Sequence, residues 1–200
     1  MSQKLILQDD HILGRGGLRV CYLHPQDPNL VIKLPVGGKT EEIKANISEL
    51  KSFQALVAKH GQLPFISRCH GLVNTNRGEG LVCDCIRDAS GAVSKTIWDL
   101  FTSGKKYDID NIILLATDFC NFLQKNDVWL FDLNLQNLAL QVQHGSSCRI
   151  IAIDLKGRFS NNEFIKISSY FDFFARRKVK RRCHQLLATL HSYKKEGEKG

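Results

Sequence analysis

Several residues of this chain have types and spacings that suit phosphate and metal chemistry. The first are Gly14, Gly16 and Gly17, in the run Leu-Gly-Arg-Gly-Gly-Leu-Arg-Val over residues 13–20. Glycines allow a β-turn to lie flat against phosphate groups and to offer them backbone N–H donors. A hairpin turn without a ligand has the same composition, so these glycines alone do not indicate a function.

Lys33 and Glu49 form a second combination. Lys33 follows Val-Ile in a β-prone run, where its side chain points to one face of the strand and those of its neighbours to the other. The next predicted helix carries Glu49 beside its apolar stripe, where the carboxylate can hold the lysine extended toward a phosphate. Glu42, two turns earlier on nearly the same face, is an alternative partner. In a purely structural reading, Lys33 lies on the surface and Glu49 pairs with Lys44 or Lys51.

Asp132, Asn137 and Asp154 complete the set. The first two have an Asp-x4-Asn spacing within one loop, and Asp154 ends an apolar strand before a glycine turn. A carboxylate at position 132 can accept a proton from a hydroxyl nucleophile. The amide oxygen of Asn137 and the carboxylate of Asp154 are hard oxygen ligands of the kind Mg²⁺ prefers. Each of these residues alone is more often a turn former that bonds its own backbone.

The order of these residues predicts phosphoryl transfer from ATP with Mg²⁺. In this reaction the protein mainly positions phosphates, metal and nucleophile, and neutralises the charge that develops.

The elements that must hold these residues predict an α+β fold. Apolar residues recur every three or four positions between Thr40 and His60, which indicates a helix with one buried stripe at Ile43, Ile47, Leu50, Phe53 and Val57. The remaining pattern is strand-like first and mainly helical later. Strands are expected near residues 5–7, 12–13, 19–23, 30–34, 69–73, 80–86, 138–142 and 149–153, and further helices over 96–101, 109–125 and 164–191.

We therefore expect an N-terminal lobe over residues 1–90, made of an antiparallel five-stranded sheet and one helix. A reduced, mainly helical C-terminal lobe would span residues 91–193 and carry the Asp132 loop. Residues 194–200 are polar and basic, and are expected to form a flexible tail.

Composition limits the class of protein. The chain has 200 residues, of which 43% are hydrophobic and 24% charged, as in an ordinary globular protein. No apolar run approaches the roughly 20 residues of a bilayer span, and no signal peptide is visible, so a cytoplasmic protein is expected. Seven cysteines without a CxxC pair fit a reducing compartment. A metal site from Cys69, His70, Cys83 and Cys85 is conceivable, although its C-x-C spacing is unusual for zinc.

The charge is concentrated at the C-terminal end. The net charge is +8, and residues 176–200 carry +7 of it, mostly in the run from Arg176 to Arg182. This run is either a solvated helix surface or a contact for an anionic membrane or an acidic partner. Specific nucleic-acid binding is not expected, because no aromatic residues are interleaved with the basic run and no known motif is present.

The chain resembles the PhoP regulatory network protein YrbL family, a minimal bacterial form of the protein-kinase-like fold. The resemblance covers roughly residues 10–190. It rests on the runs Leu13-Gly-Arg-Gly, Val-Ile-Lys33, Glu49-Leu-Lys, Arg68-Cys-His-Gly71, Val82-Cys-Asp-Cys-Ile86, Leu133-Asn-Leu-Gln-Asn137 and Asp154-Leu-Lys-Gly157.

The resemblance implies a two-lobe kinase-like fold that binds ATP and Mg²⁺ between its lobes. By this resemblance, Gly14, Gly16 and Gly17 form the phosphate-covering loop, Lys33 is the phosphate-binding lysine and Glu49 is its partner. Asp132 is the catalytic acid, and Asn137 and Asp154 are the magnesium ligands. The hinge that contacts adenine consists of Asp84, Cys85 and Ile86.

Some positions depart from the usual kinase pattern. Leu130 and Phe131 stand where His-Arg normally precedes the catalytic acid, and Asn134 replaces a lysine that commonly steadies the γ-phosphate. Two functions stay open: a phosphotransferase acting on an unknown hydroxyl acceptor, and a nucleotide-binding pseudokinase that regulates a protein partner.

Overall fold

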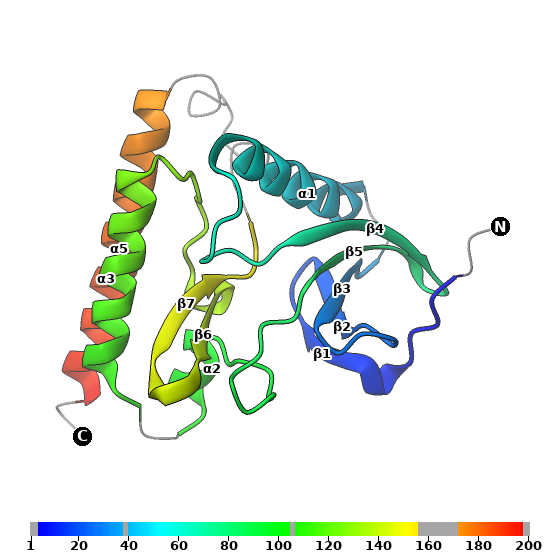
Figure 1. The fold of residues 1–200 in the computed structure, drawn as a ribbon, viewed down its shortest axis with the longest axis horizontal. Helices are drawn as coiled ribbons and strands as arrows, with labels where there is room; N and C mark the ends of the chain where they lie inside the picture. Colours follow the sequence, from blue (N-terminus) through cyan, green and yellow to red (C-terminus); the bar gives the residue numbers. More distant parts are fainter. Residues whose placement is uncertain (1–3, 38–39, 105–106, 156–171, 198–200) are drawn as a thin grey trace.

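The computed structural model describes residues 4–37, 40–104, 107–155 and 172–197, apart from the side chains of residues 40–42, 146 and 197. Within these residues it is an α+β structure, as predicted, with a five-stranded antiparallel sheet, a two-stranded sheet and four α-helices. Figure 1 shows the larger sheet at the N-terminal end of the molecule and the long helices α3 and α5 at the opposite end.

The larger sheet has the strand order β1-β2-β3-β5-β4. Its strands are β1 (Ile12–Arg15), β2 (Arg19–Leu23), β3 (Leu30–Pro35), β4 (Cys69–Thr75) and β5 (Gly78–Asp84). The turn between β4 and β5 is shorter than the gap between the expected strands, which end at residue 73 and begin at residue 80. The Thr75 hydroxyl closes it by donating to the carbonyl of Gly78 at 2.7 Å and accepting from the Arg77 N–H. Gly78 has a φ of 111°, which favours glycine at this position.

Helix α1 (Thr40–His60) covers one face of this sheet, and its buried face differs from the predicted one. Ile43 and Ile47 of the predicted stripe are 44% and 37% exposed. Asn46, Glu49 and Ser52 are buried instead. The prediction of the apolar stripe was therefore wrong for the first half of the helix, because polar contacts with the sheet outweigh the burial of two isoleucines.

The C-terminal half of the chain has fewer strands and longer helices. It contains α2 (Ile97–Thr102), α3 (Ile109–Lys125), β6 (Leu138–Val142), β7 (Cys148–Ala152) and α5 (Asp172–Gly197), with short 3-10 turns at Asp9–His11, Leu135–Asn137 and His144–Ser146. Thr96 and Asp99 form a capping box at α2, and Asp108 accepts from the Asn111 N–H to cap α3.

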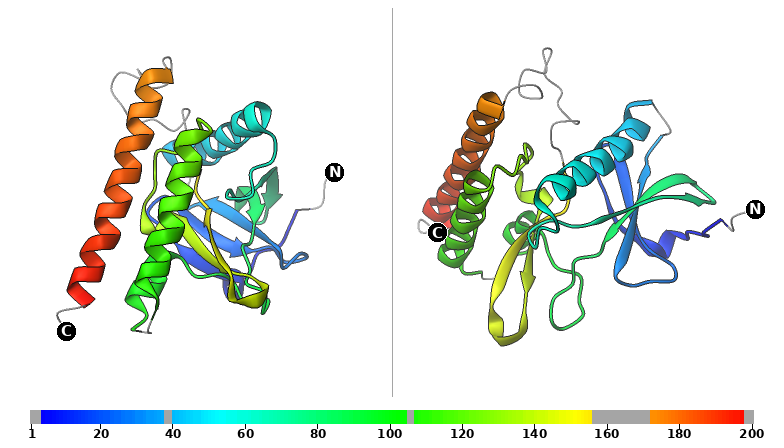
Figure 2. Two further views of the ribbon diagram at one scale, coloured as in Figure 1. Left: turned by 60° about the vertical axis from the view of Figure 1, so that its left-hand side comes forward. Right: turned by 45° about the horizontal axis from the view of Figure 1, so that its top comes forward.

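Helices α3 and α5 pack side by side in every view (Figure 2). Residues 164–171, the start of the expected last helix, lie outside the described residues. The helix continues through Gly197, past the residue at which a flexible tail is expected, and Lys194 donates to the Asp110 carboxylate at 2.6 Å. Within the described residues, no helix is both long and apolar enough to cross a membrane.

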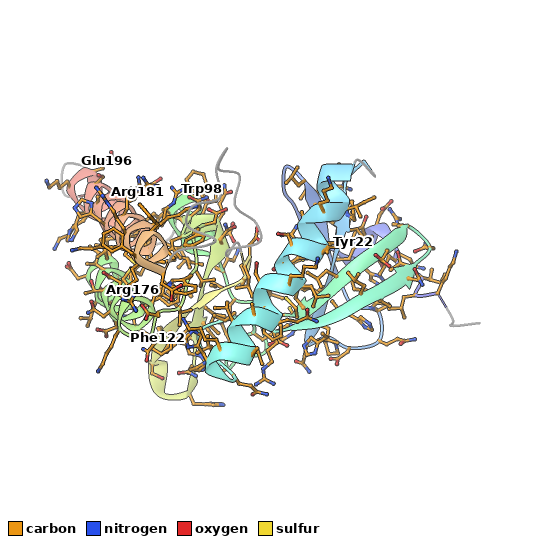
Figure 3. All side chains as sticks on the ribbon, turned by 90° about the horizontal axis from the view of Figure 1, so that it is seen from above. Tyr22, Trp98, Phe122, Arg176, Arg181 and Glu196 are labelled. Carbon is orange, nitrogen blue, oxygen red and sulfur yellow. The ribbon has the colours of Figure 1, made fainter. Side chains whose placement is uncertain are left out.

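One apolar core joins the sheet to the helices. It contains Val31 and Leu81 from the sheet, Leu56 from α1, and Leu123 and Leu190 from α3 and α5. A smaller cluster around Tyr22 and Ile32 lies on the other face of the sheet. Figure 3 shows the arrangement from above, with α1 between the sheet, where Tyr22 is labelled, and the α3–α5 pair.

Replacing Gly80 of β5 with alanine is expected to destabilise the sheet. An added Cβ would lie 2.5 Å from Ile32 Cγ2 and 3.0 Å from Leu34 Cδ2. Ile32 is fully buried and β-branched, so it has little room to move, and overpacking of this kind costs about 1–3 kcal/mol. Urea denaturation would measure the loss. Gly14→Ala is the matched control, because its added Cβ meets no atom within 4 Å; equal stability of both variants would contradict this close approach.

Candidate functional site

A buried ion pair between Lys33 and Glu49 lies at the centre of the candidate site. Lys33 Nζ donates to Glu49 Oε1 at 2.7 Å and to the backbone carbonyl of Ile153 at 2.6 Å. Glu49 is only 2% exposed and Lys33 only 8%. The lysine therefore connects β3 and α1 with the chain that follows β7, and the surface pairings of Glu49 with Lys44 or Lys51 are not formed.

Arg19, at the start of β2, is a second cation at Glu49. Its Nη1 donates to Glu49 Oε2 and to Asn46 Oδ1, and its Nη2 lies 3.0 Å from Asp154 Oδ1. Asn46 also donates to the backbone carbonyl of Lys33 at 2.8 Å. These bonds explain why Asn46 and Glu49, and not the isoleucines, face the sheet.

The sequence predictions missed Arg19 and Asn46. A signal for Arg19 is present in the alternation along β2, because Val20 and Tyr22 enter the small outer cluster. Arg19 and Cys21 must then point to the opposite face, and Cys21 is paired in register with Lys33. No comparable signal exists for Asn46, since its burial depends on the rotation of α1.

The small sheet places Asn137 and Asp154 close to each other. Leu138 of β6 pairs with Ala152 of β7, and just beyond this pair the Ile153 N–H donates to the Asn137 carbonyl at 2.9 Å. Asp154 is the next residue. Two residues that are far apart in the sequence thus meet at one end of a hairpin, beside Lys33.

Asp132 lies in the loop that leads to this hairpin. The amide of Asn134 donates to Asp132 Oδ1, and the amide of Asn137 reaches the Asp132 carbonyl at 3.5 Å. A cavity of about 100 Å³ lies between this loop and α5, lined in part by Asn134, Arg182 and Gln185. The loop therefore joins Asp132 to Asn137 and places both residues near the end of β7.

Carboxylates keep both buried cations charged. Burial alone would lower the pKa of Lys33, but Glu49 outweighs it and raises that pKa above its usual range. Burial likewise opposes the charge of Arg19, while Glu49 and Asp154 raise the pKa of Arg19. Burial also raises the pKa of the neighbouring Cys21 thiol to about 11. Two cations and two carboxylates thus form a balanced cluster.

The glycine-rich turn between β1 and β2 lies directly before Arg19. The Gly16 N–H donates to the Arg19 carbonyl at 2.8 Å and closes the turn. Gly14, Gly16 and Gly17 are exposed, and none of them has a positive φ. A Cβ added at Gly14 or Gly17 meets no atom within 4 Å, so the turn has an open surface.

The predicted hinge, Asp84, Cys85 and Ile86, uses many of its polar groups inside the protein. The Asp84 N–H donates to the Arg68 carbonyl, the Cys85 N–H donates to the Asn29 carbonyl, and the Ile86 carbonyl accepts from Ser94. The Asp84 carbonyl accepts from Ser67, and its carboxylate accepts from the Arg68 N–H and contacts His70 at 2.7 Å. These bonds fix the path of the chain after β5.

The four residues Cys69, His70, Cys83 and Cys85 do not come together as a metal site. In the part of the chain that is described, the potential ligands that gather within 4.8 Å are Glu49, Cys69 and Cys83. Glu49 is already bound by two cations, so a metal ion there would meet Lys33 and Arg19. Cys69 Sγ and Cys83 Sγ are 3.6 Å apart, and their hydrogen bond, together with burial, raises the pKa of Cys69.

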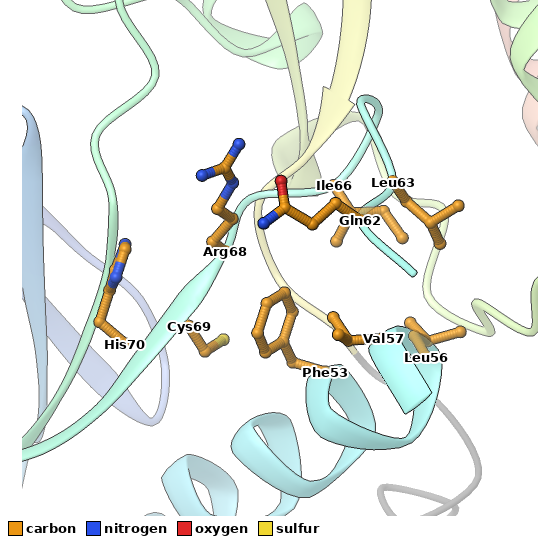
Figure 4. Close-up of a pocket in the computed structure, with 9 residues that line it drawn as sticks. All are labelled: Phe53, Leu56, Val57, Gln62, Leu63, Ile66, Arg68, Cys69 and His70. Atoms are coloured by element: carbon orange, nitrogen blue, oxygen red, sulfur yellow. The ribbon is translucent and has the colours of Figure 1, made fainter. Parts of the chain in front are cut away.

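A separate cavity of about 290 Å³ lies between α1 and β4 (Figure 4). None of the residues predicted to bind nucleotide or magnesium lines it, although Cys69 and His70 of the candidate metal site do. Its walls are mainly apolar, with the Gln62 amide and the Arg68 guanidinium close together in the close-up. The nine lining residues are Phe53, Leu56, Val57, Gln62, Leu63, Ile66, Arg68, Cys69 and His70.

The basic run from Arg176 to Arg182 is only partly available to a partner. Arg176 forms a two-point ion pair with Asp127, at 2.8 and 2.7 Å, and Lys178 is buried with its Nζ 4.3 Å from the Phe131 ring centre. Besides the paired Arg176, the exposed cations of the run are Arg177, Lys180 and Arg181, the last of which is labelled in Figure 3.

The fold and the cluster define an α+β protein in which a buried lysine–glutamate pair joins a sheet, its covering helix and the end of a small hairpin. A family model described as PhoP regulatory network protein YrbL matches residues 5–191. The chain therefore belongs to the YrbL family, which confirms the resemblance seen in its motifs.

Curated relatives carry the same family name. The uncharacterized protein YrbL of Escherichia coli (strain K12) and that of Shigella flexneri are each 33% identical to the chain over 137 residues. The match covers 66% of this chain and 63% of each relative, so the chain spans somewhat less than two thirds of their length.

Glu49→Gln is expected to destabilise the protein more than Lys33→Met. The first change leaves Lys33 and Arg19 buried without their shared carboxylate, and breaking a buried pair in this way costs about 3–5 kcal/mol. The second change removes one cation, while Glu49 keeps Arg19. Chemical denaturation of both variants would show which of them loses more stability. A larger loss for Lys33→Met would contradict the central role of Glu49.

The Asp127–Arg176 pair should stabilise the protein in a pH-dependent way. Its hydrogen bonds hold the pKa of Asp127 below the usual 3.8. A lowered carboxyl pKa adds stability above pH 4, and this stability is lost as the pH falls through the folded value. The melting temperatures of wild type and Arg176→Ala should therefore differ at pH 6 and converge as the pH falls below the folded pKa of Asp127. A difference in melting temperature that does not change with pH would show that the Asp127–Arg176 ion pair is not its cause.

Proposed function

We propose that this protein binds ATP with Mg²⁺ in a reduced protein-kinase-like arrangement and transfers a phosphoryl group to a hydroxyl acceptor. The observation that carries the proposal is the Lys33–Glu49 ion pair, 2.7 Å long and buried, whose lysine also contacts the chain beside Asp154. In protein kinases a strand lysine is paired with a helix glutamate in this way and contacts the phosphates.

The arrangement of elements supports the two-lobe proposal. The five-stranded sheet and α1 would form the lobe over residues 1–90, and α2, α3, β6, β7 and α5 the lobe over residues 91–193. The predicted hinge, Asp84 to Ile86, is the segment that leads from β5 into the second part.

The phosphates would lie between Lys33 and the turn at Gly14, Gly16 and Gly17. The open surface of this turn allows close approach of a ligand to its backbone N–H groups. Recognition of the base would use the backbone of Asp84, Cys85 and Ile86. Because many polar groups of this segment already have partners in the protein, we expect weak discrimination between ATP and GTP.

Asn137 and Asp154 fit a magnesium ion. The hairpin brings an amide and a carboxylate to one end, which are oxygen donors of the type Mg²⁺ accepts. The amide of Asn137 donates toward Asp132, which leaves its oxygen as the ligand atom. When bound, the ion would supply positive charge to the phosphates.

Asp132 would be the catalytic base. Its carboxylate would take the proton of the acceptor hydroxyl as that oxygen bonds to the γ-phosphorus and the bond from the γ-phosphorus to the ADP oxygen breaks. Lys33 would hold the phosphates that leave with ADP. Asn134, two residues after this base in the loop, already donates to one of its oxygens and helps to orient it.

A regulatory pseudokinase is the second candidate function. Leu130 and Phe131 are buried in the core next to Asp132, where they contribute packing and no charge. The family description, PhoP regulatory network protein, concerns regulation and not a reaction. In this alternative, nucleotide binding would be retained and contact with a protein partner would be the function.

We propose that the protein acts in the cytoplasm and that Arg177, Lys180 and Arg181 on α5 make a weak contact with anionic membrane lipids. The three cations are exposed, and each well-placed charge contributes about 1 kcal/mol near an anionic surface. Triple substitution with glutamine should abolish sedimentation with vesicles of anionic phospholipid. Binding unaffected by the substitution or by salt would contradict this contact.

Thermal-shift titration with ATP and Mg²⁺ tests the binding site. A ligand at about 100 times its dissociation constant stabilises the folded state by about 2.7 kcal/mol, which is a readily measured shift. Wild type should show the shift and Lys33→Met should lose it, while Arg181→Gln, the control on α5, should keep it. The absence of a shift in the wild type would overturn the proposed function.

Asp132→Ala distinguishes the two candidate functions. The variant should retain the thermal shift with ATP and Mg²⁺ but lose ATP turnover, since it lacks the base and keeps the phosphate site. If wild type and Asp132→Ala show the same background turnover while both bind ATP, the protein is the pseudokinase.

A further inference from the structure

Arg19 lies between Glu49 and Asp154, beside the residues proposed to bind the metal and the phosphates. Its guanidinium contacts Glu49 on one side and Asp154 on the other, and the side chain is only 13% exposed. Asp154 is the proposed magnesium ligand. In the structure without ligands, its Oδ1 is therefore already paired with a cation of the protein.

The charges of the cluster explain how the Arg19–Asp154 ion pair would affect ligand binding. Arg19 and Lys33 balance Glu49 and Asp154, so a divalent ion added at Asp154 would create an excess of positive charge in a buried place. A polyphosphate added alone would face the carboxylates. A metal ion and a polyphosphate together bring opposite charges and keep the balance.

We propose that Arg19 makes this site selective for the metal–triphosphate complex over either component alone. On binding, Asp154 exchanges the Arg19 guanidinium for the metal ion, and the released guanidinium contacts a phosphate oxygen, while Glu49 keeps Lys33. Arginine suits this role because its planar group can bind a carboxylate or a phosphate with two parallel N–H donors. This inference rests on the proposed function, of which it names the specificity-determining residue.

The position of Arg19 in the fold supports such an exchange. It lies two residues after Gly17, at the end of the hairpin whose open turn is proposed to cover the phosphates. In the proposed exchange, a small movement of this hairpin would carry the guanidinium from Asp154 toward the phosphates. Lys33 is not placed to do the same, because its Nζ donates to Glu49 and to the Ile153 carbonyl, whereas Nη2 of Arg19 contacts Asp154. Asn46 carries no charge and cannot replace the guanidinium.

The test compares two ligands whose affinities should change in opposite directions when Arg19 is replaced. Binding of Mn²⁺ alone, followed by electron paramagnetic resonance, should become about tenfold tighter in Arg19→Gln, because Asp154 loses its competing cation. Binding of ATP with Mg²⁺, followed by thermal shift, should become about tenfold weaker in the same variant, because a phosphate contact is lost. Arg19→Lys should lie between wild type and Arg19→Gln in both measurements.

Two further variants control this comparison. Arg181→Gln removes the same charge from an exposed position on α5 and should change neither affinity. Asp154→Asn should abolish the gain in Mn²⁺ affinity when it is combined with Arg19→Gln. Melting temperatures without ligand show whether each variant is folded, and the conservative Arg19→Lys variant keeps the test valid if Arg19→Gln does not fold.

The outcomes separate this inference from the proposed function. If Arg19→Gln binds both ligands more weakly, or binds both as the wild type does, Arg19 is a structural residue and the inference is wrong, although ATP binding by the wild type still supports the proposed function. If the wild type binds no ATP but Arg19→Gln binds Mn²⁺ more tightly, the proposed function fails and the competition between Arg19 and the metal at Asp154 is retained.

Discussion

The carboxylate of Glu49 is buried, and a buried carboxylate must be neutralised by groups that reach it. Two cations do so from different strands, Lys33 on β3 and Arg19 on β2. This constraint sets the rotation of α1, since the helix has to turn Glu49 and Asn46 toward the sheet and leave Ile43 and Ile47 partly exposed. Both isoleucines are already more than half buried, so burying the rest of them would return less free energy than an unpaired buried charge costs.

The same cluster also connects the sheet with the rest of the chain. Lys33 bonds to the carbonyl of Ile153, Arg19 to Asp154, and the Leu155 N–H points to Glu49 at 3.4 Å. Apolar packing between the sheet and the helices would hold the two parts together without fixing their relative position. The directional hydrogen bonds and ion pairs fix that position, and they bring the end of β7 to the face of the sheet where the proposed phosphate site lies.

The proposed chemistry uses groups that are also structural. A ligand that took Asp154 from Arg19 would remove one of the bonds between the sheet and the end of β7, so binding and the relative position of these elements are linked. The same linkage would serve either an enzyme or a regulatory protein of the YrbL family. What would separate these functions is the environment of Asp132, where Asn134 and the buried Phe131 stand at positions that carry charged residues in the usual kinase pattern.

Local sequence determined most of the elements, including the bounds of α3, since caps, turn residues and apolar periodicity act over a few neighbouring positions. It also predicted Lys33, Glu49, Asp132, Asn137 and Asp154 as a set. Only the tertiary structure decided the buried face of α1 and the role of Arg19. Both features depend on which charged groups meet across strands that are distant in the sequence. The periodicity of apolar residues does not show which polar residues will be paired.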